Sequence, residues 1–275
     1  MTKKNNSILL SVPYALWMLV FTLIPLGVVA YYALTDPDTG NFTLQNIQDL
    51  GMFLPTLGIS AAYALISAFI CLLLGYPVAY YIAHRTPVMQ KILYMLVMLP
   101  MCMSFLLRTL AWVGLLESNG ILNSLLGALH LKPITMIGTP SAVILGMVYN
   151  YLPYMILPLY AVIVKIDNRL IEAAEDLGCN GTQVFARVVL PLSMPGILSG
   201  ITMVFVPAVS TFYISQKLGG AETMLIGDVI EKQFKTSNNP NMGAALSLLL
   251  MLMVLVCTGI MNRFGGDDEE GGVIV

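Results

Sequence analysis

The length of its uncharged apolar runs is the strongest constraint on how this chain can fold. Between Lys4 and Asp36 there is no charged residue, and the apolar part of that stretch runs from Ile8 to Leu34. A helix needs about 20 apolar residues to cross the hydrocarbon core of a bilayer. A signal peptide has an apolar region of only about 7–15 residues, so we interpret this stretch as an uncleaved first span.

The composition agrees with a membrane protein. Of the 275 residues, 57% are hydrophobic and 10% are charged, and the mean hydropathy is +0.82. Soluble domains have a charged share of about 25%. No basic stripe accompanies the formal net charge of -2, which argues against a nucleic-acid partner.

Further apolar runs of spanning length follow the first. We therefore predict an all-α integral membrane protein that forms a single transmembrane domain over residues 1–275, with both ends on the same side of the bilayer. The six predicted spans are 8–34, 57–82, 92–107, 142–164, 197–214 and 244–261.

The distribution of lysine and arginine predicts the orientation, because short cytoplasmic loops collect these residues. A cytoplasmic N-terminus places the larger group inside, namely Lys3, Lys4, Arg85, Lys91, Lys165, Arg169, Arg187 and Arg263. The opposite face then holds Arg108, Lys132, Lys217, Lys232 and Lys235. We therefore expect a multi-pass membrane protein with both termini in the cytoplasm.

Two segments outside the spans have their own signals. Between Arg108 and Thr139, short apolar pieces alternate with turn residues such as Asn119-Gly120, which favours a surface-lying or re-entrant helix. Arg108 itself is most simply an interfacial anchor. Residues 265–275 are predicted to form a disordered acidic tail.

Residues 165–194 form a polar connection between the fourth and fifth predicted spans. Asp167 or Asn168 suits the N-cap of a helix from Arg169 to Leu177, and Gly178 can end it in the left-handed conformation. A second helix is predicted to start at Gly181, with Thr182 as its cap.

The first of these helices is predicted to have two distinct faces. By helical spacing, Leu170, Ala174 and Leu177 share an apolar face. The acidic residues Glu172, Glu175 and Asp176 lie on another. A helix that rests on a lipid surface is usually rich in lysine and arginine instead. The acidic face therefore favours a soluble protein partner.

The same connection resembles the EAA loop of the permease subunits of ABC importers. The resemblance is carried by Glu172-Ala173-Ala174, Gly178, Val188 and Leu190-Pro191, with valine at 188 where isoleucine is usual. It implies the type I importer fold and a cytoplasmic coupling helix that docks into a groove on the ATPase. The residues it assigns to coupling are Glu172, Ala173, Ala174, Gly178, Val188, Leu190 and Pro191.

The resemblance extends from Leu74-Gly75-Tyr76-Pro77 to the last span. Segments such as Thr139-Pro140-Ser141-Ala142 and Gly219-Gly220-Ala221 are similar to the permeases of spermidine/putrescine importers. This implies polyamine transport by a complex with a second, homologous permease subunit, two cytoplasmic ABC ATPase subunits and an extracellular or periplasmic polyamine-binding protein.

Enzymatic chemistry is not expected in this chain. There is no GxxxxGK[ST] loop to bind phosphates and no nucleophile motif, so ATP and Mg²⁺ are expected on the partner ATPase subunits. The four cysteines are isolated, and His84 and His130 have no neighbour at ligand spacing, so neither a metal site nor a bound cofactor is predicted.

A cation that crosses the bilayer would be helped by carboxylates, hydroxyls and aromatic faces along a protein-walled path. The fourth span offers tyrosines around Pro153, the fifth offers polar and aromatic residues after Pro207, and the outer segment offers acidic residues. The candidates are Tyr149, Tyr151, Tyr154, Ser210, Thr211, Phe212, Tyr213, Glu222 and Asp228. The alternatives are an interfacial aromatic belt for the tyrosines and a solvated loop face for the acidic residues.

Two other functions remain open from the sequence. The chain could be an ABC permease for another small solute, although the spans lack the basic cluster that an anion would favour. It could also be a channel or membrane sensor whose loop recruits a signalling protein. A channel or sensor should function without an ATPase, whereas a permease subunit should be inert alone.

Overall fold

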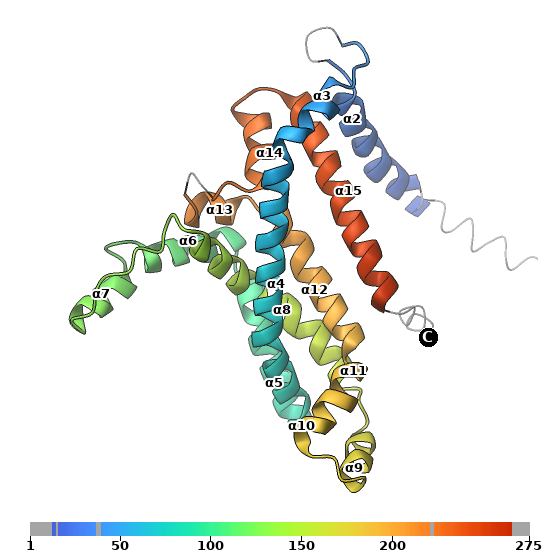
Figure 1. The fold of residues 1–275 in the computed structure, drawn as a ribbon, viewed down its shortest axis with the longest axis vertical. Helices are drawn as coiled ribbons and strands as arrows, with labels where there is room; N and C mark the ends of the chain where they lie inside the picture. The colour runs from blue at the N-terminus through green and yellow to red at the C-terminus, as the bar shows by residue number, and fades with distance from the viewer. Residues whose placement is uncertain (1–12, 15, 37–39, 221–222, 266–275) are drawn as a thin grey trace, which may run out of the picture. The chain divides into compact units, whose positions relative to one another are not determined.

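The computed structural model describes residues 13–14, 16–36, 40–220 and 223–265 (Figure 1). Within these ranges the regular elements are helices, with one isolated antiparallel bridge between Thr35 and Phe42. The predicted all-α fold is confirmed. Lys3, Lys4, the beginning of the first predicted span, Glu222 and residues 266–275 of the predicted acidic tail lie outside the described residues.

Four helical stretches in the described part of the chain are long and apolar enough to cross a membrane: Leu16–Ala33, Gln45–Ala83, Pro140–Ile163 and Pro240–Met261. Two bent helix pairs raise this number to six if each pair is one span. The first pair joins Pro87–Cys102 to Phe105–Ala128 at 86°, and the second joins Gly181–Leu192 to Met194–Val209 at 64°.

The stretches predicted as the third and fifth spans are interrupted in the structure. Helix α5 (Pro87–Met98) passes into a 3-10 turn at Leu99–Cys102, and α6 (Phe105–Leu116) starts in a new direction. Helix α12 (Met194–Val209) ends before a short break, and α13 (Tyr213–Leu218) follows. Pro100 and Pro207 lie next to these breaks, and proline removes a backbone donor from the helix.

The chain divides into two compact units. Unit 1 comprises residues 1–55 and 229–253, and unit 2 comprises residues 56–228 and 254–275. Unit 1 contains α2 (Ile24–Ala33), α3 (Gln45–Gln48), most of α14 (Ile226–Lys235) and the first part of α15 (Pro240–Gly265). Its buried amides converge on one carbonyl, because Asn46 and Asn241 donate to the Thr35 oxygen at 2.9 and 2.6 Å.

Unit 2 is built on α4 (Leu54–Ala83), α8 (Pro140–Ile163) and α12 around Met155, which is fully buried. A Cβ added at Gly75 of α4 would lie 3.2 Å from Met155 Cγ, and one added at Gly200 of α12 would lie 2.6 Å from Met155 Sδ. Small residues allow membrane helices to approach closely in this way. The Met155 side chain therefore fills the space between two glycines on neighbouring helices.

Gly196 lies one turn before Gly200 on α12 and completes a GxxxG pattern against α8. A Cβ at Gly196 would lie 3.0 Å from Val162 Cβ and 3.1 Å from the Pro158 carbonyl oxygen. Both neighbours belong to α8, and neither is the end of a flexible side chain. The close approach of α8 and α12 thus requires glycine at this position.

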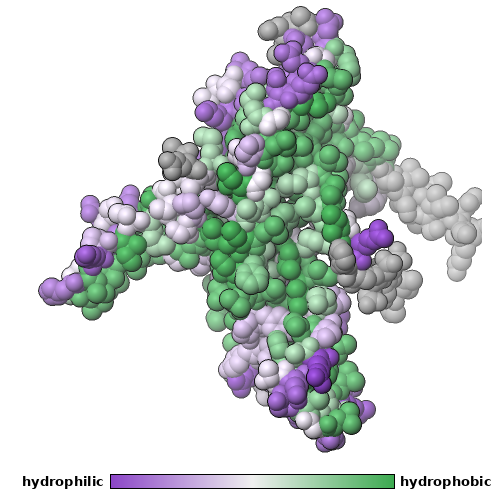
Figure 2. Space-filling model, viewed as in Figure 1, coloured by the Kyte–Doolittle hydropathy of each residue, from purple (hydrophilic) through white to green (hydrophobic). Residues whose placement is uncertain are grey.

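Two further groups of helices belong to unit 2. Helices α6 and α7 (Ile121–Ala128) run across the direction of α4 (Figure 1). The surface-lying or re-entrant placement expected after Arg108 stays a prediction. Helices α9 (Asn168–Asp176), α10 (Gly181–Val184) and α11 (Leu190–Leu192) lie at one end of the unit. Figure 2 shows hydrophilic residues gathered over α9 and α10, and hydrophobic surface over the long helices of the unit.

We predict that Gly196→Val destabilises the protein by about 1–3 kcal/mol, because the added atoms overlap the α8 backbone in a packed interior. Thermal unfolding of the purified protein in detergent measures the effect. Gly58→Val is the matched control, since Gly58 is exposed on α4 and a Cβ there meets no atom within 4 Å. Equal unfolding temperatures for the two variants would contradict the packing role of Gly196.

Candidate functional site

Helix α9 is a short, fully capped helix at one end of unit 2. Asp167 is its N-cap and accepts a hydrogen bond from the Arg169 amide at 3.0 Å. At its C-terminus, Gly178 has a φ of 88°, and its amide donates to the Glu175 oxygen at 2.8 Å. The Cys179 amide donates to the Ala174 oxygen at 3.1 Å, which completes a Schellman motif. The predicted caps at Asp167 and Gly178 are confirmed.

Both faces of α9 are open to partners. Glu172, Glu175 and Asp176 are exposed on the acidic face. On the apolar face Leu170 is 48% exposed and Leu177 is 86% exposed. Two large apolar side chains thus lie exposed at one short helix that also carries exposed carboxylates. The helix therefore presents acidic and apolar contacts together, in a form suited to a protein surface.

The second half of the loop is attached to α4. Phe185 packs edge to face on Tyr76 and Tyr80, with ring centroids 5.4 and 6.2 Å apart. The buried hydroxyls of Tyr76 and Ser193 are 2.8 Å apart in a hydrogen bond. These contacts join the loop to the helix packed on α8. The sequence did not predict these contacts, because Phe185 and Tyr76 are far apart in the chain and nothing in their sequence neighbourhoods distinguishes them from other apolar residues.

The prediction that Thr182 caps the second helix is wrong. The cap is Asn180, whose Oδ1 accepts from the Gln183 amide at 2.9 Å, while Gln183 Oε1 accepts from the Asn180 amide at 2.9 Å. This reciprocal capping box satisfies two backbone donors, which a threonine two residues later does not do. The signal was present in the sequence as Asn180 followed three residues later by Gln183.

The candidate coupling residues divide into outward and inward groups. Glu172 and Ala173 are exposed on α9, and Ala174 is half-buried. Val188 lies in a π-helical stretch, Phe185–Val189, and is half-buried, as is Leu190 in α11. Pro191 is exposed. The exposed residues thus lie on α9 and at Pro191 of α11, and Val188 and Leu190 lie on the part of the loop that is attached to α4.

Several of the candidate path residues meet at the break after α12. Tyr151 is buried on α8 and donates a hydrogen bond to the Pro207 carbonyl at 3.3 Å. Its hydroxyl also lies beside the Thr211 side chain, and its ring is 6.3 Å from that of Tyr154. Ser210 donates to the Val206 carbonyl at 3.1 Å. Hydroxyl groups thus satisfy backbone carbonyls that the broken helix leaves without partners.

Tyr213, after the break, packs against α6. The Tyr213 ring lies 6.3 Å from that of Phe105, and Lys217 Nζ lies 5.8 Å from the Tyr213 ring centroid. Phe212 is 41% exposed between the buried Thr211 and the half-buried Tyr213. The structure therefore places residues 210–213 at a junction of α6, α8, α12 and α13.

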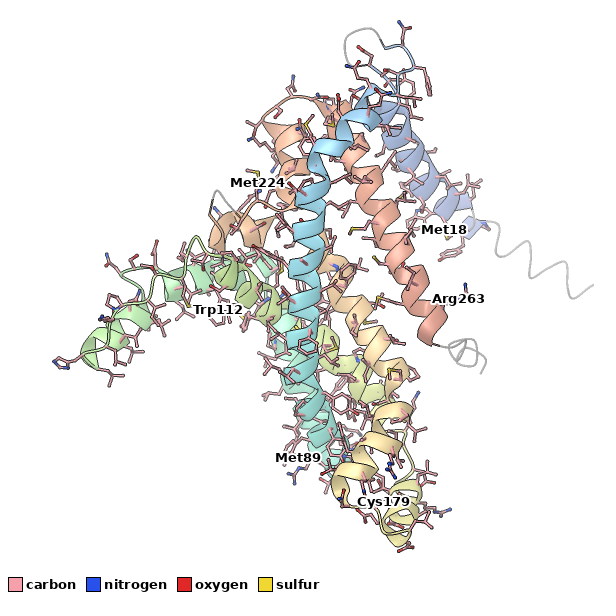
Figure 3. All side chains as sticks on the ribbon, viewed as in Figure 1. Met18, Met89, Trp112, Cys179, Met224 and Arg263 are labelled. Carbon is pink, nitrogen blue, oxygen red and sulfur yellow. The ribbon has the colours of Figure 1, made fainter. Side chains whose placement is uncertain are left out.

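Two other candidate path residues, Tyr149 and Asp228, make their contacts with other parts of the chain. Tyr149 stacks edge to face on Trp112 of α6, with ring centroids 5.2 Å apart; Trp112 is labelled in Figure 3. Asp228 is buried near the start of α14, and its Oδ2 accepts from the Leu225 amide at 2.8 Å. Asp228 therefore also stabilises the local backbone, which the sequence interpretation as a path residue did not anticipate.

The interpretation of Arg108 as an interfacial anchor is wrong. Arg108 lies in the first turns of α6 and is 7% exposed. The chain bends sharply before α6, and this bend turns the helix onto α8 and α13 rather than out of unit 2. The sequence contained no signal for this bend except Pro100 and the short polar break that follows it.

No group of three or more His, Cys, Asp or Glu side chains gathers in a metal-binding arrangement within the described residues. The two regions described above offer different contacts. The α9 end offers acidic and apolar contacts to a protein, and the junction at residues 210–213 offers hydroxyls, carbonyls and aromatic faces.

Comparison of the sequence with known proteins identifies a protein family that this chain matches. The family model described as "Binding-protein-dependent transport system inner membrane component" matches residues 75–265. Among curated proteins, the spermidine/putrescine transport system permease protein PotB of Haemophilus influenzae is 41% identical over 251 residues, or 87% of each chain. PotB of Escherichia coli is 38% identical over 247 residues, which cover 86% of this chain and 90% of that protein.

Solved structures show the same fold at lower identity. A chain of a bacterial ABC transporter involved in the import of the acidic polysaccharide alginate has a TM-score of 0.74 and 18% identity, with 95% of this chain and 96% of that chain covered. A chain of the MetNI methionine ABC transporter has a TM-score of 0.59 and 16% identity, with 79% and 96% covered.

The family match starts at Gly75, close to the point where the sequence resemblance begins, and it contains the whole EAA loop. The helical fold, the exposed α9 and the similarity over most of the chain agree with one another. The chain therefore belongs to the family of inner-membrane permeases of binding-protein-dependent ABC transport systems.

Proposed function

We propose that this chain is a permease subunit of an ABC importer and forms half of the translocation path for polyamines such as spermidine and putrescine. The observation that carries the proposal is the 38–41% identity to two PotB proteins over most of the chain. The subunit has no catalytic or cofactor site of its own in this proposal. ATP with Mg²⁺ is bound and hydrolysed by partner subunits.

The proposed partners follow from the two ends of unit 2. Two cytoplasmic ATPase subunits serve the complex, and one of them receives α9, whose exposed Leu170 and Leu177 suit an apolar groove and whose Glu172 suits a basic rim. A second, homologous permease subunit completes the path. An extracellular or periplasmic binding protein delivers the polyamine. Both termini of this chain face the cytoplasm, on the same side as α9.

The loop offers a direct mechanical route from ATPase to path. Residues 165–194 join the end of α8, which carries Tyr151, to the start of α12, which ends at Val209 just before Ser210. When the ATPases close, α9 moves as a rigid, capped body and displaces the attached ends of both helices. The path then alternates between access from outside and access from the cytoplasm.

The proposed path residues act by weak, reversible contacts. Aromatic faces attract an ammonium group by cation–π interaction, and hydroxyl and carbonyl oxygens accept its hydrogen bonds. Tyr149, Tyr151, Tyr154, Phe212 and Tyr213 supply the first kind of group. Ser210 and Thr211 supply the second. Glu222 and Asp228 supply negative charge toward the outer end, which raises the local concentration of a polycation.

We predict that a bacterial strain without this chain loses high-affinity uptake of labelled spermidine or putrescine, and that the restored gene recovers it. The measurement is uptake in the presence of competing unlabelled polyamines, amino acids and sugars. Competition by polyamines alone is the expected result. Intact polyamine uptake together with the loss of uptake of another solute would overturn the substrate assignment and leave the permease role standing.

We predict that Gly178→Val weakens the coupling of ATP hydrolysis to transport. A β-branched residue in the left-handed conformation costs about 1–2 kcal/mol, so the Schellman motif opens and α9 loses its rigid end. The assay is ATP hydrolysis by the reconstituted complex, with and without loaded binding protein. Gly181→Val is the matched control, because Gly181 is exposed, has no positive φ and meets no atom within 4 Å.

We predict that Glu172→Arg lowers transport and the stimulation of ATP hydrolysis at least tenfold, since about 1.4 kcal/mol of lost docking energy gives that factor. Glu172→Gln should have a smaller effect, because it keeps the shape and removes only the charge. An acidic substitution of a basic residue in the ATPase groove should restore coupling to the Glu172→Arg complex. Indifference of coupling to both Glu172 variants would leave the shape of α9 as the sole determinant.

A further inference from the structure

Arg108 is a buried cation within unit 2. Its side chain is 93% buried, since its exposed fraction is 7%, and Nε and Nη1 have no hydrogen-bond acceptor among the described residues. The ion pair that the structure forms between described residues is Lys235 with Glu231, on α14. Arg108 therefore has no anionic partner in the part of its own chain that the structure describes.

Such an arrangement is costly in a working protein. The guanidinium group of arginine is a delocalised cation with five N–H donors and no acceptor, so it calls for acceptors or an anion around it. A buried charge without a partner is strongly unfavourable, whereas a buried charge with a well-placed counter-ion is tolerated. An anionic group that comes from elsewhere should therefore meet Arg108 in the assembled protein.

The position of Arg108 shows what the missing group would do. Phe105 and Trp112, about one turn away on either side, fix α6 against Tyr213 and Tyr149. Arg108 is close enough to Tyr151 for an electrostatic interaction with its hydroxyl, which in turn lies beside Thr211. The positive charge thus lies at the junction that the proposed function assigns to the path of a cation.

The junction is open on one side. Ser210 and Phe212 are exposed on either side of the buried Thr211, so this face of the break is not covered by the described part of the chain. A group that approaches from a neighbouring subunit can reach the junction here. A carboxylate held by a protein also loses less translational freedom on binding than a free ion does.

We propose that Arg108 forms an ion pair with a carboxylate of the second permease subunit, at the junction of α6, α8, α12 and α13. The proposal rests on the proposed function, in which two permease subunits share one path. The pair neutralises the fixed positive charge that would repel a polyamine. It also makes the carboxylate a shared ligand, for which the ammonium groups of the cargo compete with the guanidinium.

The test compares Arg108→Gln in two states of the full chain. In the chain purified alone, the substitution removes an uncompensated charge, so the unfolding temperature should stay the same or rise. In the complex with the second permease subunit and the ATPases, it leaves a carboxylate unpaired, so the unfolding temperature should fall. Arg108→Lys keeps the charge and should lower the stability of the complex less than Arg108→Gln does.

The matched control is Arg85→Gln. Arg85 is an exposed arginine of the same unit and lies 4.0 Å from the Tyr81 ring centroid. Its substitution should change the unfolding temperature of the chain and that of the complex by the same amount. The partner carboxylate is then identified by charge exchange, in which Arg108→Glu combined with a lysine at one acidic residue of the second permease restores the stability of the complex.

Two results would overturn the ion pair. One is a change in unfolding temperature on Arg108→Gln that has the same direction and size in the chain alone and in the complex. The other is a loss of stability of the wild-type chain alone when chloride is replaced by gluconate, which would assign Arg108 to an inorganic anion. Co-purification of a second permease with the wild-type chain is a separate check on the proposed function, so the two failures are distinguishable.

Discussion

The insertion of Met155 between Gly75 and Gly200 is the contact on which unit 2 depends. In a bilayer the lipid tails are as apolar as the side chains, so helices associate mainly through close van der Waals packing and interhelical hydrogen bonds. Glycine at these two positions allows α4 and α12 to approach α8 closely enough for Met155 to contact both. The tyrosines of α8 and the break after α12 owe their relative positions to this packing.

The same packing determines what the loop at residues 165–194 can do. Because the loop runs from the end of α8 to the start of α12, its two ends belong to helices that meet at Met155. Phe185 and Ser193 attach the loop to Tyr76 of α4 as well. A force on α9 would therefore reach three packed helices together. Capping at Asp167 and Gly178 makes α9 stiff enough to transmit such a force rather than unwind.

The breaks in the membrane helices are the places where polar chemistry becomes possible. A broken helix leaves carbonyl groups without partners, and within lipid these must be satisfied by protein groups or by water. Tyr151 and Ser210 donate to carbonyls at the end of α12. Arg108 reaches the same junction from α6 because the chain bends sharply before that helix. Hydroxyls, aromatic faces and a charge thus gather where the backbone departs from regular helix.

Sequence alone predicted the helical class and the ends of α9, because these depend on local properties. Apolar length determines whether a helix can span a bilayer, and the chemistry of Asp167 and Gly178 determines where a helix starts and stops. The family resemblance likewise rested on residues close together in the chain, from Glu172 to Pro191. The wrong cap at Thr182 also concerned a local property, since the capping-box pattern of Asn180 and Gln183 is present in the sequence.

The tertiary structure decided which residues meet. Tyr149 and Tyr151 are two positions apart on α8 and so face different neighbours, Trp112 in one case and the end of α12 in the other. Asp228 accepts a backbone hydrogen bond, and Arg108 is buried rather than anchored at a surface. The sequence by itself determined the long apolar helices and the capped helix α9, which follow from hydropathy and capping. Only the packing at glycines and the bends near prolines decided the junction, because those contacts join residues distant in the chain.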